Sequence, residues 1–468
     1  MARRTLKTGG IARAPLVGLA VVGLGASIGP LDFSVTVAFP AITRAFALQT
    51  SDIRWVAVWY VLSYGSLMLA FGALGDRIGH LRVFRLGLVL SAAAYVLCAL
   101  APSYHWLLAT RVLQGVAVAL TLSCGPALAI ALFDDEHRTR ALSGYAAMAS
   151  LAGVVAPILG GASVALLGWP GVYWFRVPIV LLALMCLPLL GPDLGRVHPR
   201  PRAPFDTAGS LLLSGGVALF LLLPALLRPG LAGLMAVPVA LAGSLLMMMF
   251  VKRQRLSSTP FLPHALVRDA NFIVANLSSV IVQFASFAVP LTVPYYLTRI
   301  ATCGPLASGA LLAIWATGAM AGSAFATRAV RLRGARRSAF HAGLLVIAGL
   351  AGIGCWPNTA HYPLVIFSLL LQGLGIGLFQ VAYTDLVVVA LPSSARGVAG
   401  SLTMVTRTVG IVIGASAWIW ILQTGESAGL SAGIAADHAF VAAFHRVFQT
   451  AACVAGGFFA LSYCRWRV

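Results

Sequence analysis

The chain has 468 residues, and 60% of them are hydrophobic, compared with about 45–50% in soluble domains. Only 9% are Asp, Glu, Lys or Arg, where a soluble domain has roughly 25%. So few charges cannot cover a water-facing surface, and disorder is excluded because it requires low hydrophobicity and high charge. The composition therefore predicts an all-α polytopic membrane protein, since helices satisfy their own backbone hydrogen bonds in lipid.

The formal net charge of +20 does not indicate a nucleic-acid partner. No stretch combines a dense basic run with the interleaved aromatic residues that stack on bases. The seven cysteines lie in or beside apolar segments without metal or disulfide spacing. The phosphate-binding GxxxxGK[ST] loop and the HExxH zinc helix do not occur. We therefore expect no nucleic acid, no metal, no cofactor and no enzymatic activity.

The apolar stretches predict fourteen transmembrane helices, because a bilayer core of about 30 Å requires about 20 helical residues. The first stretch is longer than the apolar part of a signal peptide, about 7–15 residues, so we interpret it as a membrane span. In chain order the predicted spans are Leu16–Ile42, Trp55–Leu74, Phe84–Ala101, Leu107–Phe133, Ala141–Leu167, Val172–Leu190, Ala208–Leu227, Leu231–Val251, Phe272–Leu297, Leu306–Ala326, Phe340–Trp356, Tyr362–Leu391, Val398–Leu422 and Val447–Tyr463.

The distribution of Lys and Arg between the spans predicts the orientation, since cytoplasmic loops carry the excess of positive charge. With the N-terminus inside, 24 of the 32 basic residues fall in cytoplasmic segments. Two more lie within spans. The other six are assigned to the outside, and they are Arg44, Arg54, Arg176, Arg228, Arg299 and Arg446. Both termini are therefore expected in the cytoplasm.

Three sequence patterns recur at an offset of 255–258 residues, which predicts an internal repeat. They are Leu113-Gln114-Gly115 with Leu371-Gln372-Gly373, Arg140-x-x-x-Gly144-x-x-x-Met148 with Arg396-x-x-x-Gly400-x-x-x-Met404, and Gly79-x-x-Arg82 with Gly334-x-x-Arg337. We divide the chain into a six-helix bundle at 1–191, two inserted helices at 192–270 and a second bundle at 271–468. Such repeats suit alternating access, with a substrate site near the membrane midplane between the two bundles.

Four motifs follow one another in the first bundle: Leu31–Pro40, Trp55–Leu62, Gly72–Arg82 and Arg111–Gly115. Together they resemble the fourteen-helix drug/proton antiporter branch of the major facilitator superfamily. Gly72-Ala-Leu-Gly-Asp76-Arg77-Ile-Gly79-His-Leu-Arg82 is similar to the signature G-x-L-a-D-R-x-G-r-k-x-x of that superfamily. The resemblance extends over nearly the whole chain.

The resemblance implies a secondary transporter of a bacterial inner membrane that exports small amphipathic or drug-like molecules in exchange for protons. The family motif G-x-x-x-G-P-x-x-G-G appears here with alanine at 152 and 156 in place of its two leading glycines. This departure keeps open a proton-coupled permease or exporter of one metabolite. A non-transporting membrane sensor is a third reading. The expected partners are a small-molecule substrate, protons and the lipid bilayer, and we expect a monomer.

The loop signature is interpreted as a gate. Gly72 and Gly79 allow close helix approach and a tight turn. Asp76 can accept hydrogen bonds from the N-terminus of a neighbouring helix, where the helix dipole favours negative charge. With Arg77 and Arg82 it would form a latch between the two bundles. The alternative is a topology anchor that obeys the positive-inside rule.

Four charged residues are candidates for positions near the centres of predicted spans: Asp32, Arg111, Asp385 and Arg407. Each costs about 2.5–3.5 kcal/mol on insertion scales, so each is a functional candidate. At a rise of 1.5 Å per residue, Asp32 and Arg111 come close enough to pair, and Asp385 and Arg407 both lie toward the cytoplasm. We therefore expect one carboxylate and one guanidinium from each bundle for proton coupling, with Asp32 as the leading candidate. The alternative is a static buried pair.

The substrate contacts are predicted from the repeat and from residue type. Gln114 and Gln372 correspond across the repeat, which makes them the leading polar candidates for a central cavity. Aromatic and methionine side chains would suit lipophilic substrates. The candidates of this kind are Tyr60, Tyr64, Tyr383, Met148 and Met404, with Gln283, Phe287, Trp315 and Gln380 as further possibilities. At any single one of these positions, ordinary helix packing is the alternative.

Overall fold

The computed structural model describes residues 13–133, 137–190, 231–256, 269–391 and 399–466, together with six single positions between 209 and 223. All regular secondary structure in these residues is helical. The first half consists of α1 (Arg13–Ser27), η1 (Pro30–Phe33), α2 (Ser34–Ala45), α3 (Arg54–Ile78), α4 (His80–Ala99), α5 (Tyr104–Ala131), α6 (Arg138–Leu167), α7 (Gly171–Trp174), α8 (Arg176–Cys186) and η3 (Leu187–Leu190).

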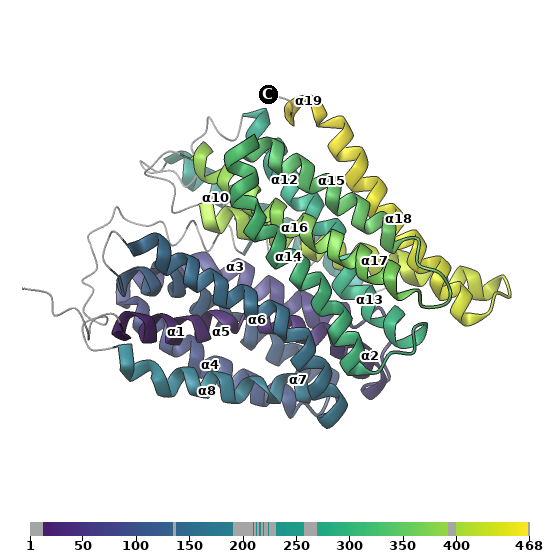
Figure 1. Ribbon diagram of the computed structural model, residues 1–468, viewed down its shortest axis with the longest axis horizontal. Coiled ribbons are helices and arrows are strands. Elements are labelled where there is room, and N and C mark those ends of the chain that lie inside the picture. The colour runs from purple at the N-terminus through teal and green to yellow at the C-terminus, as the bar shows by residue number, and fades with distance from the viewer. Residues whose placement is uncertain are drawn as a thin grey trace, which may run out of the picture.

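The second half follows after a peripheral helix, α10 (Leu231–Leu256). It consists of α12 (Ala270–Ser286), α13 (Ala288–Arg299), α14 (Pro305–Arg333), α15 (Ala335–Ile353), α16 (Tyr362–Ala390), α17 (Ala399–Ser431), α18 (Ala436–Leu461) and α19 (Tyr463–Trp466). Figure 1 shows the two halves as separate helical layers, the first in purple and blue and the second in green and yellow.

The corresponding turns of the two halves have the same backbone conformation. Gly79 joins α3 to α4 with φ of 99°, and Gly334 joins α14 to α15 with φ of 79°. Residues with a Cβ atom rarely adopt this left-handed region, so glycine is needed at both turns. The pattern Gly-x-x-Arg that repeats in the sequence therefore marks the same helix-to-helix turn in each half.

The first helix of each half is interrupted near its middle. In the first half, α1 ends at Ser27 and the chain forms the short 3₁₀ helix η1 before α2 begins. In the second half, α12 ends at Ser286 and α13 begins at Ala288. Irregular backbone at membrane depth is tolerated where it is buried in protein or lines a cavity. The break in the first half places Asp32 on η1, facing the space between the two halves.

Eleven helices in the described residues are long and apolar enough to cross a membrane, and α3 adds a twelfth as a helix bent by 47°. The predicted span Phe340–Trp356 corresponds to α15, which is helical but is not among these. The predicted span Ala208–Leu227 lies largely outside the described residues. The fold is therefore that of a multi-pass helical membrane protein, and the predicted number of fourteen is not established.

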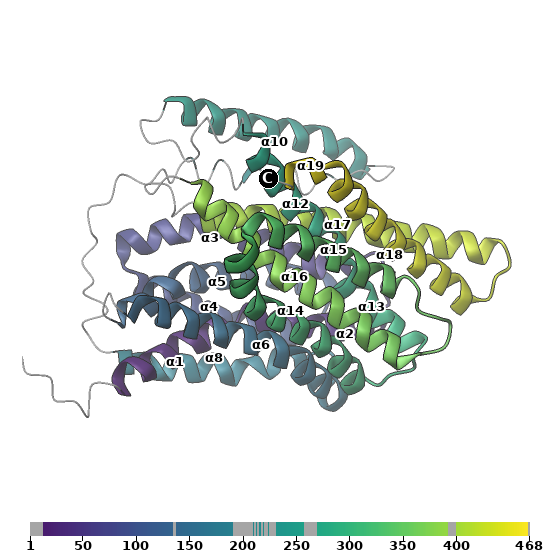
Figure 2. The ribbon, with the colours of Figure 1, turned by 45° about the horizontal axis from the view of Figure 1, so that its top comes forward.

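The α10 helix lies apart from both halves. Figure 2 shows it along the outer edge of the molecule, beside the second half. Most of its side chains are exposed, and they are largely apolar, as expected for a helix that faces lipid. The division of the chain into two bundles and two inserted helices stays a prediction.

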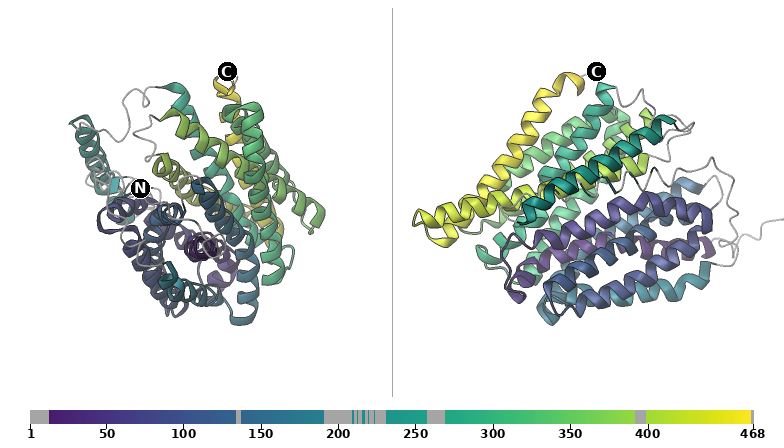
Figure 3. Two further views of the ribbon diagram at one scale, coloured as in Figure 1. Left: turned by 60° about the vertical axis from the view of Figure 1, so that its left-hand side comes forward. Right: turned by 180° about the vertical axis from the view of Figure 1, so that it is seen from behind.

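The two halves pack most extensively through α6 and α14. A Cβ atom added to Gly309 would clash with the carbonyl oxygen of Pro157, and one added to Gly161 would clash with the carbonyl oxygen of Pro305. Near the same end, the hydroxyl groups of Thr43 in α2 and Tyr295 in α13 are 2.7 Å apart. The halves are thus held backbone to backbone at the end of the molecule where α2 and α13 finish, and Figure 3 shows them meeting there.

Candidate functional site

A cavity of about 580 Å³ lies between the halves. This volume is in the range of sites for drug-sized molecules. Both halves supply its walls. The first contributes Asp32, Phe33, Tyr60, Tyr64, Arg111 and Tyr145, and the second contributes Gln283, Phe287, Trp315, Gln380, Met404 and Arg407.

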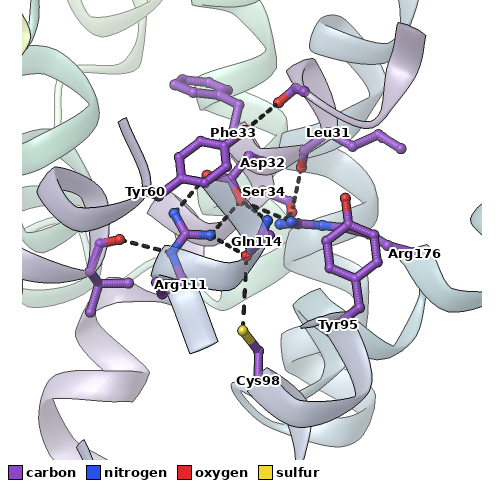
Figure 4. A network of polar contacts seen from close by, with 12 residues as sticks. Leu31, Asp32, Phe33, Ser34, Tyr60, Tyr95, Cys98, Arg111, Gln114 and Arg176 are labelled. Atoms are coloured by element: carbon purple, nitrogen blue, oxygen red, sulfur yellow. Dashed lines mark hydrogen bonds and ion pairs between the residues drawn. The ribbon is translucent and has the colours of Figure 1, made fainter. Parts of the chain in front are cut away.

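Asp32 is the centre of a charge cluster in the cavity wall (Figure 4). Arg111 of α5 donates from both terminal nitrogens to both carboxylate oxygens, over 2.6 and 2.8 Å. The pairing of these two residues, expected from their depths in the membrane, is therefore present. A bidentate pair of this kind fixes the relative orientation of both groups as well as their distance.

Arg176 is a second cation on the same carboxylate, and the sequence analysis missed it. Its Nη1 donates to Asp32 Oδ1 over 2.9 Å, and its Nη2 donates to the hydroxyl of Ser34 over 2.6 Å. The side chain is fully buried, although the charge count assigned Arg176 to an external segment. A signal was available, since Arg176 lies four residues inside the predicted span Val172–Leu190.

Neighbouring groups hold the two arginines in place. Arg111 Nε donates to the carbonyl of Val56 over 2.8 Å, and its guanidinium lies 4.3 Å from the ring centre of Tyr60. The Arg176 guanidinium lies near the rings of Tyr95 and Tyr173. Cation–π contacts of this kind partly replace the hydration that the guanidinium groups lose on burial. The two arginines are consequently held in fixed positions by their neighbours. The cluster reaches the cavity at Asp32, whose side chain is 12% exposed.

The two glutamines that correspond across the repeat, Gln114 and Gln372, do not line the cavity. Gln114 is fully buried behind the cluster, where its amide donates to Asp32 Oδ1 over 2.9 Å and its oxygen accepts from Arg111 over 2.7 Å. Gln372 is also fully buried, and its oxygen accepts a hydrogen bond from the indole of Trp315. Gln114 therefore positions the charge cluster, and Gln372 supports a side chain that itself faces the cavity.

The other predicted substrate residues divide into two groups. Tyr60, Tyr64 and Met404 line the cavity as predicted. Tyr383 instead lies in the core of the second half, where its hydroxyl is 2.9 Å from Asn276 Oδ1 and 3.0 Å from Thr406 Oγ1. Met148 packs against α1, where a Cβ atom on Gly23 would clash with its sulfur. For Tyr383 and Met148, helix packing is what the structure shows.

The second half does not repeat the charge cluster. Leu369 precedes Gln372 by three residues, as Arg111 precedes Gln114, so the guanidinium has no counterpart there. Asp385 and Arg407 do not form an ion pair with each other, and Asp385 is not among the described residues that line the cavity. The expectation of one carboxylate and one guanidinium at the site from each half is therefore wrong for Asp385. Arg407 does line the cavity, from α17.

The predicted gate residues lie at the opposite end from the α6–α14 contact. Asp76 and Arg77 are exposed in the last turn of α3, and Asp76 Oδ1 is 3.2 Å from His80 Nε2 in α4. Arg82 donates to the carbonyl of Ile78 over 3.5 Å. A Cβ atom on Gly72 would come no closer than 4.0 Å to Ser123, so this glycine is not forced by a close approach to another helix. The latch between the halves stays a prediction.

Broken helices, a central cavity and walls from both halves are typical of membrane transporters that work by alternating access. Comparison with known proteins supports this assignment. Residues 16–415 match the Major Facilitator Superfamily, and the chain belongs to that family. It is a secondary transporter and not an enzyme.

Several relatives have names that describe resistance or transport. The chain is 29% identical to the methylenomycin A resistance protein of Bacillus subtilis, over 85% of each chain. It is 28% identical to the multidrug efflux pump LfrA of Mycolicibacterium smegmatis, over 85% of this chain and 79% of the pump. It is 24% identical to the riboflavin transporter RibZ of Clostridioides difficile, over 85% of this chain and 86% of that transporter.

Solved structures agree on the fold. The crystal structure of a peptide transporter, POT, in complex with sulfate superimposes with a TM-score of 0.71. The match covers 96% of this chain and 95% of the peptide transporter, at 16% sequence identity. At this identity the likeness concerns the fold alone.

Proposed function

We propose that this protein exports small amphipathic or drug-like molecules in exchange for protons. The relatives that carry resistance and efflux names support export, and the size and aromatic walls of the cavity suit such substrates. The observation that carries proton coupling is the position of Asp32. It is a carboxylate in the cavity wall, next to the break in the first helix, and it is held by two arginines.

The distribution of Lys and Arg along the sequence supports one assignment of the cytoplasmic end of the molecule in the transport cycle. If the segments rich in Lys and Arg are cytoplasmic, the α6–α14 contact lies at the outer side and the cavity faces inward. In this state a cytoplasmic substrate would enter the cavity. Opening the α6–α14 contact, with closure at the opposite end, would then present the same cavity to the outside.

Protonation of Asp32 would couple proton movement to this change in the side to which the cavity opens. The proton removes the negative charge to which Arg111 and Arg176 donate, and two buried guanidinium groups would then lack a counter-ion. Such a state is costly, because an uncompensated buried charge destabilises a protein by about 3–5 kcal/mol. Rearrangement of the helices that carry these arginines would lower this cost. Because Arg176 also contacts Asp32, movement of Arg111 alone would leave one guanidinium group beside the carboxylate.

The test is transport by purified protein in liposomes with an imposed pH difference. Asp32→Asn should still bind substrate but should no longer accumulate it against a gradient. Asp385→Asn is the matched control, because it removes a carboxylate that does not line the cavity, and it should transport nearly as wild type does. Proton-driven accumulation by Asp32→Asn at the wild-type level would refute the assignment of Asp32.

A second candidate is export or uptake of one metabolite. The relative named as a riboflavin transporter favours it, as does the aromatic pair Phe33 and Trp315, whose stacked rings lie 4.9 Å apart across the two halves. Competition experiments separate the two functions. A multidrug exporter should have its transport of one dye inhibited by many unrelated lipophilic compounds, and a metabolite transporter by one compound and its close analogues.

A further inference from the structure

The second half brings a guanidinium into the cavity that has no acidic partner among the residues that the structure describes. Arg407 lines the cavity, and its Nε is buried without a hydrogen-bond acceptor. Within the described part of the chain, no carboxylate lies within ion-pair distance of it. A buried polar group without a partner is costly, so such a group in a cavity wall indicates an acceptor that arrives from outside.

The remaining charges in and behind the cavity wall add up to the same positive sign. Asp32 is the one acidic residue among the described residues that line it, and its carboxylate is already engaged by Arg111, Arg176 and Gln114. Two guanidinium groups around one carboxylate leave an excess of one positive charge, and Arg407 adds another. A cleft with walls of one sign of charge concentrates ions of the opposite sign, so this excess repels cations and attracts anions.

The apolar part of the wall complements this charge. Tyr60 and Tyr64 lie with ring centres 5.2 Å apart in α3, and Phe33 stacks on Trp315 on the facing wall. Flat aromatic molecules pack well against such rings. Gln283 and Gln380, joined by a hydrogen bond of 2.9 Å, add polar groups without charge. The wall therefore fits a molecule with an aromatic body and an acidic group.

From this arrangement we propose that the transported molecules are aromatic organic anions, and that Arg407 binds their acidic group. This inference rests on the proposed transport function and specifies its substrate class. The acidic group would be a carboxylate, a sulfonate or an ionised phenol, each of which offers oxygen atoms to the guanidinium fork. Arg407 is thereby a specificity-determining residue, separate from the Asp32 cluster that would carry the proton.

Two xanthene dyes of similar size and opposite charge provide the probes. Fluorescein is an anion and rhodamine 123 is a cation, and the binding of each to purified protein is measured by fluorescence anisotropy. The wild-type protein should bind fluorescein more tightly than rhodamine 123. Arg407→Gln should weaken fluorescein binding roughly tenfold or more, since charge-assisted hydrogen bonds contribute about 1.5–3 kcal/mol. Its binding of rhodamine 123 should be unchanged or tighter.

Two further variants separate recognition from folding. Arg407→Lys keeps the charge but loses the planar fork, so it should bind fluorescein with an affinity between those of wild type and Arg407→Gln. Arg331→Gln removes an exposed arginine at the end of α14 and should bind both dyes as wild type does. Gel filtration and thermal unfolding of each variant show whether it is folded.

The assignment of Arg407 fails if wild-type protein binds fluorescein no more tightly than rhodamine 123. It also fails if the ratio of the two affinities is the same in wild type and in folded Arg407→Gln. Transport of both dyes in liposomes is measured separately. Charge-selective binding without transport of either dye would contradict the proposed transport function and leave the binding role of Arg407 intact.

Discussion

Arg176 donates a hydrogen bond to Asp32 over 2.9 Å, although 144 residues separate the two in the chain. The contact joins the start of α8 to the break in the first helix, and together with Arg111 it surrounds one carboxylate with two cations. Both arginines are buried, and both lie in the same half as Asp32. The cluster can therefore respond to protonation within one bundle before the interface between the bundles changes.

Arg176→Gln should destabilise the first half more than the loss of a surface arginine would. The substitution removes the donor to Ser34 and one of the three donors to Asp32 Oδ1, and breaking a buried ion pair typically costs about 3–5 kcal/mol. We expect a clearly lower midpoint of thermal unfolding in detergent. Arg446→Gln is the control, because it removes another arginine that the charge count assigned to the outside but that is exposed in the structure. Equal midpoints for the two variants would mean that the ion pair contributes nothing to stability.

Gly309→Ala should shift the protein away from the state described here. The added methyl group would meet the carbonyl of Pro157, and overpacking of this kind costs about 1–3 kcal/mol. In a background without native cysteines, Cys introduced at Thr43 should therefore react faster with a membrane-impermeant maleimide. Gly304→Ala is the control in the same region, because nothing lies within 4 Å of its added Cβ atom. Similar labelling rates in both variants would show that the α6–α14 contact does not govern access to that end.

Asp76→Asn should insert normally into the membrane and transport poorly, if the loop acts as a latch between the halves. The observed contact with His80 suggests an internal role as a competing explanation, since both residues belong to the first half. The variant His80→Gln distinguishes a latch between the halves from an internal contact within the first half. A latch between halves predicts that His80→Gln transports well, whereas equal losses in both variants would assign the effect to the Asp76–His80 contact. Membrane levels are compared by immunoblotting.

Reporter fusions after residues 14 and 467 should both report a cytoplasmic location. The excess of 24 basic residues over six is the basis of this expectation. A third fusion at Gly433 should report the outside, because this exposed glycine lies in the turn between α17 and α18. The predicted spans Val398–Leu422 and Val447–Tyr463 leave a longer loop here, but α17 continues to Ser431 and α18 already begins at Ala436. A cytoplasmic signal at Gly433 would require one span fewer or one more before it.

The parts of the site that the sequence predicted are those with a local signal. A carboxylate and a guanidinium in two apolar spans at matching depth predicted the Asp32–Arg111 pair, and the repeat of Gly79 at Gly334 predicted equivalent turns. The internal repeat gives wrong predictions of side-chain contacts at positions where the two halves differ. Gln114 and Gln372 correspond in sequence, yet one contacts a charge cluster and the other the indole of Trp315. Side-chain partners depend on contacts between distant helices, and no periodicity along one helix records them.

Arg176 and Asp385 illustrate the same limit of sequence-based prediction. Arg176 belongs to the site although the sequence does not indicate it, and Asp385 does not line the cavity although the sequence suggests it. The sequence places Arg176 with the external charges because its predicted span begins only four residues earlier, and its partner Asp32 belongs to another helix. Asp385 was grouped with Arg407 because both fell on the same side of the membrane midplane, but depth does not determine which face of a helix a residue occupies. The rotation of a helix about its axis is set by packing, and the sequence of a uniformly apolar span leaves it open.

The contact between α6 and α14 is made by backbone atoms at Gly161 and Gly309, and this has a consequence for how the protein moves. Side chains at an interface can adopt new rotamers and yield gradually as two surfaces separate. Main-chain atoms in helices have no such freedom, so these two helices are either in full contact or apart. The interface should therefore behave as a two-position switch, and the halves should rotate as rigid bodies between two discrete arrangements rather than through a continuum of intermediate openings.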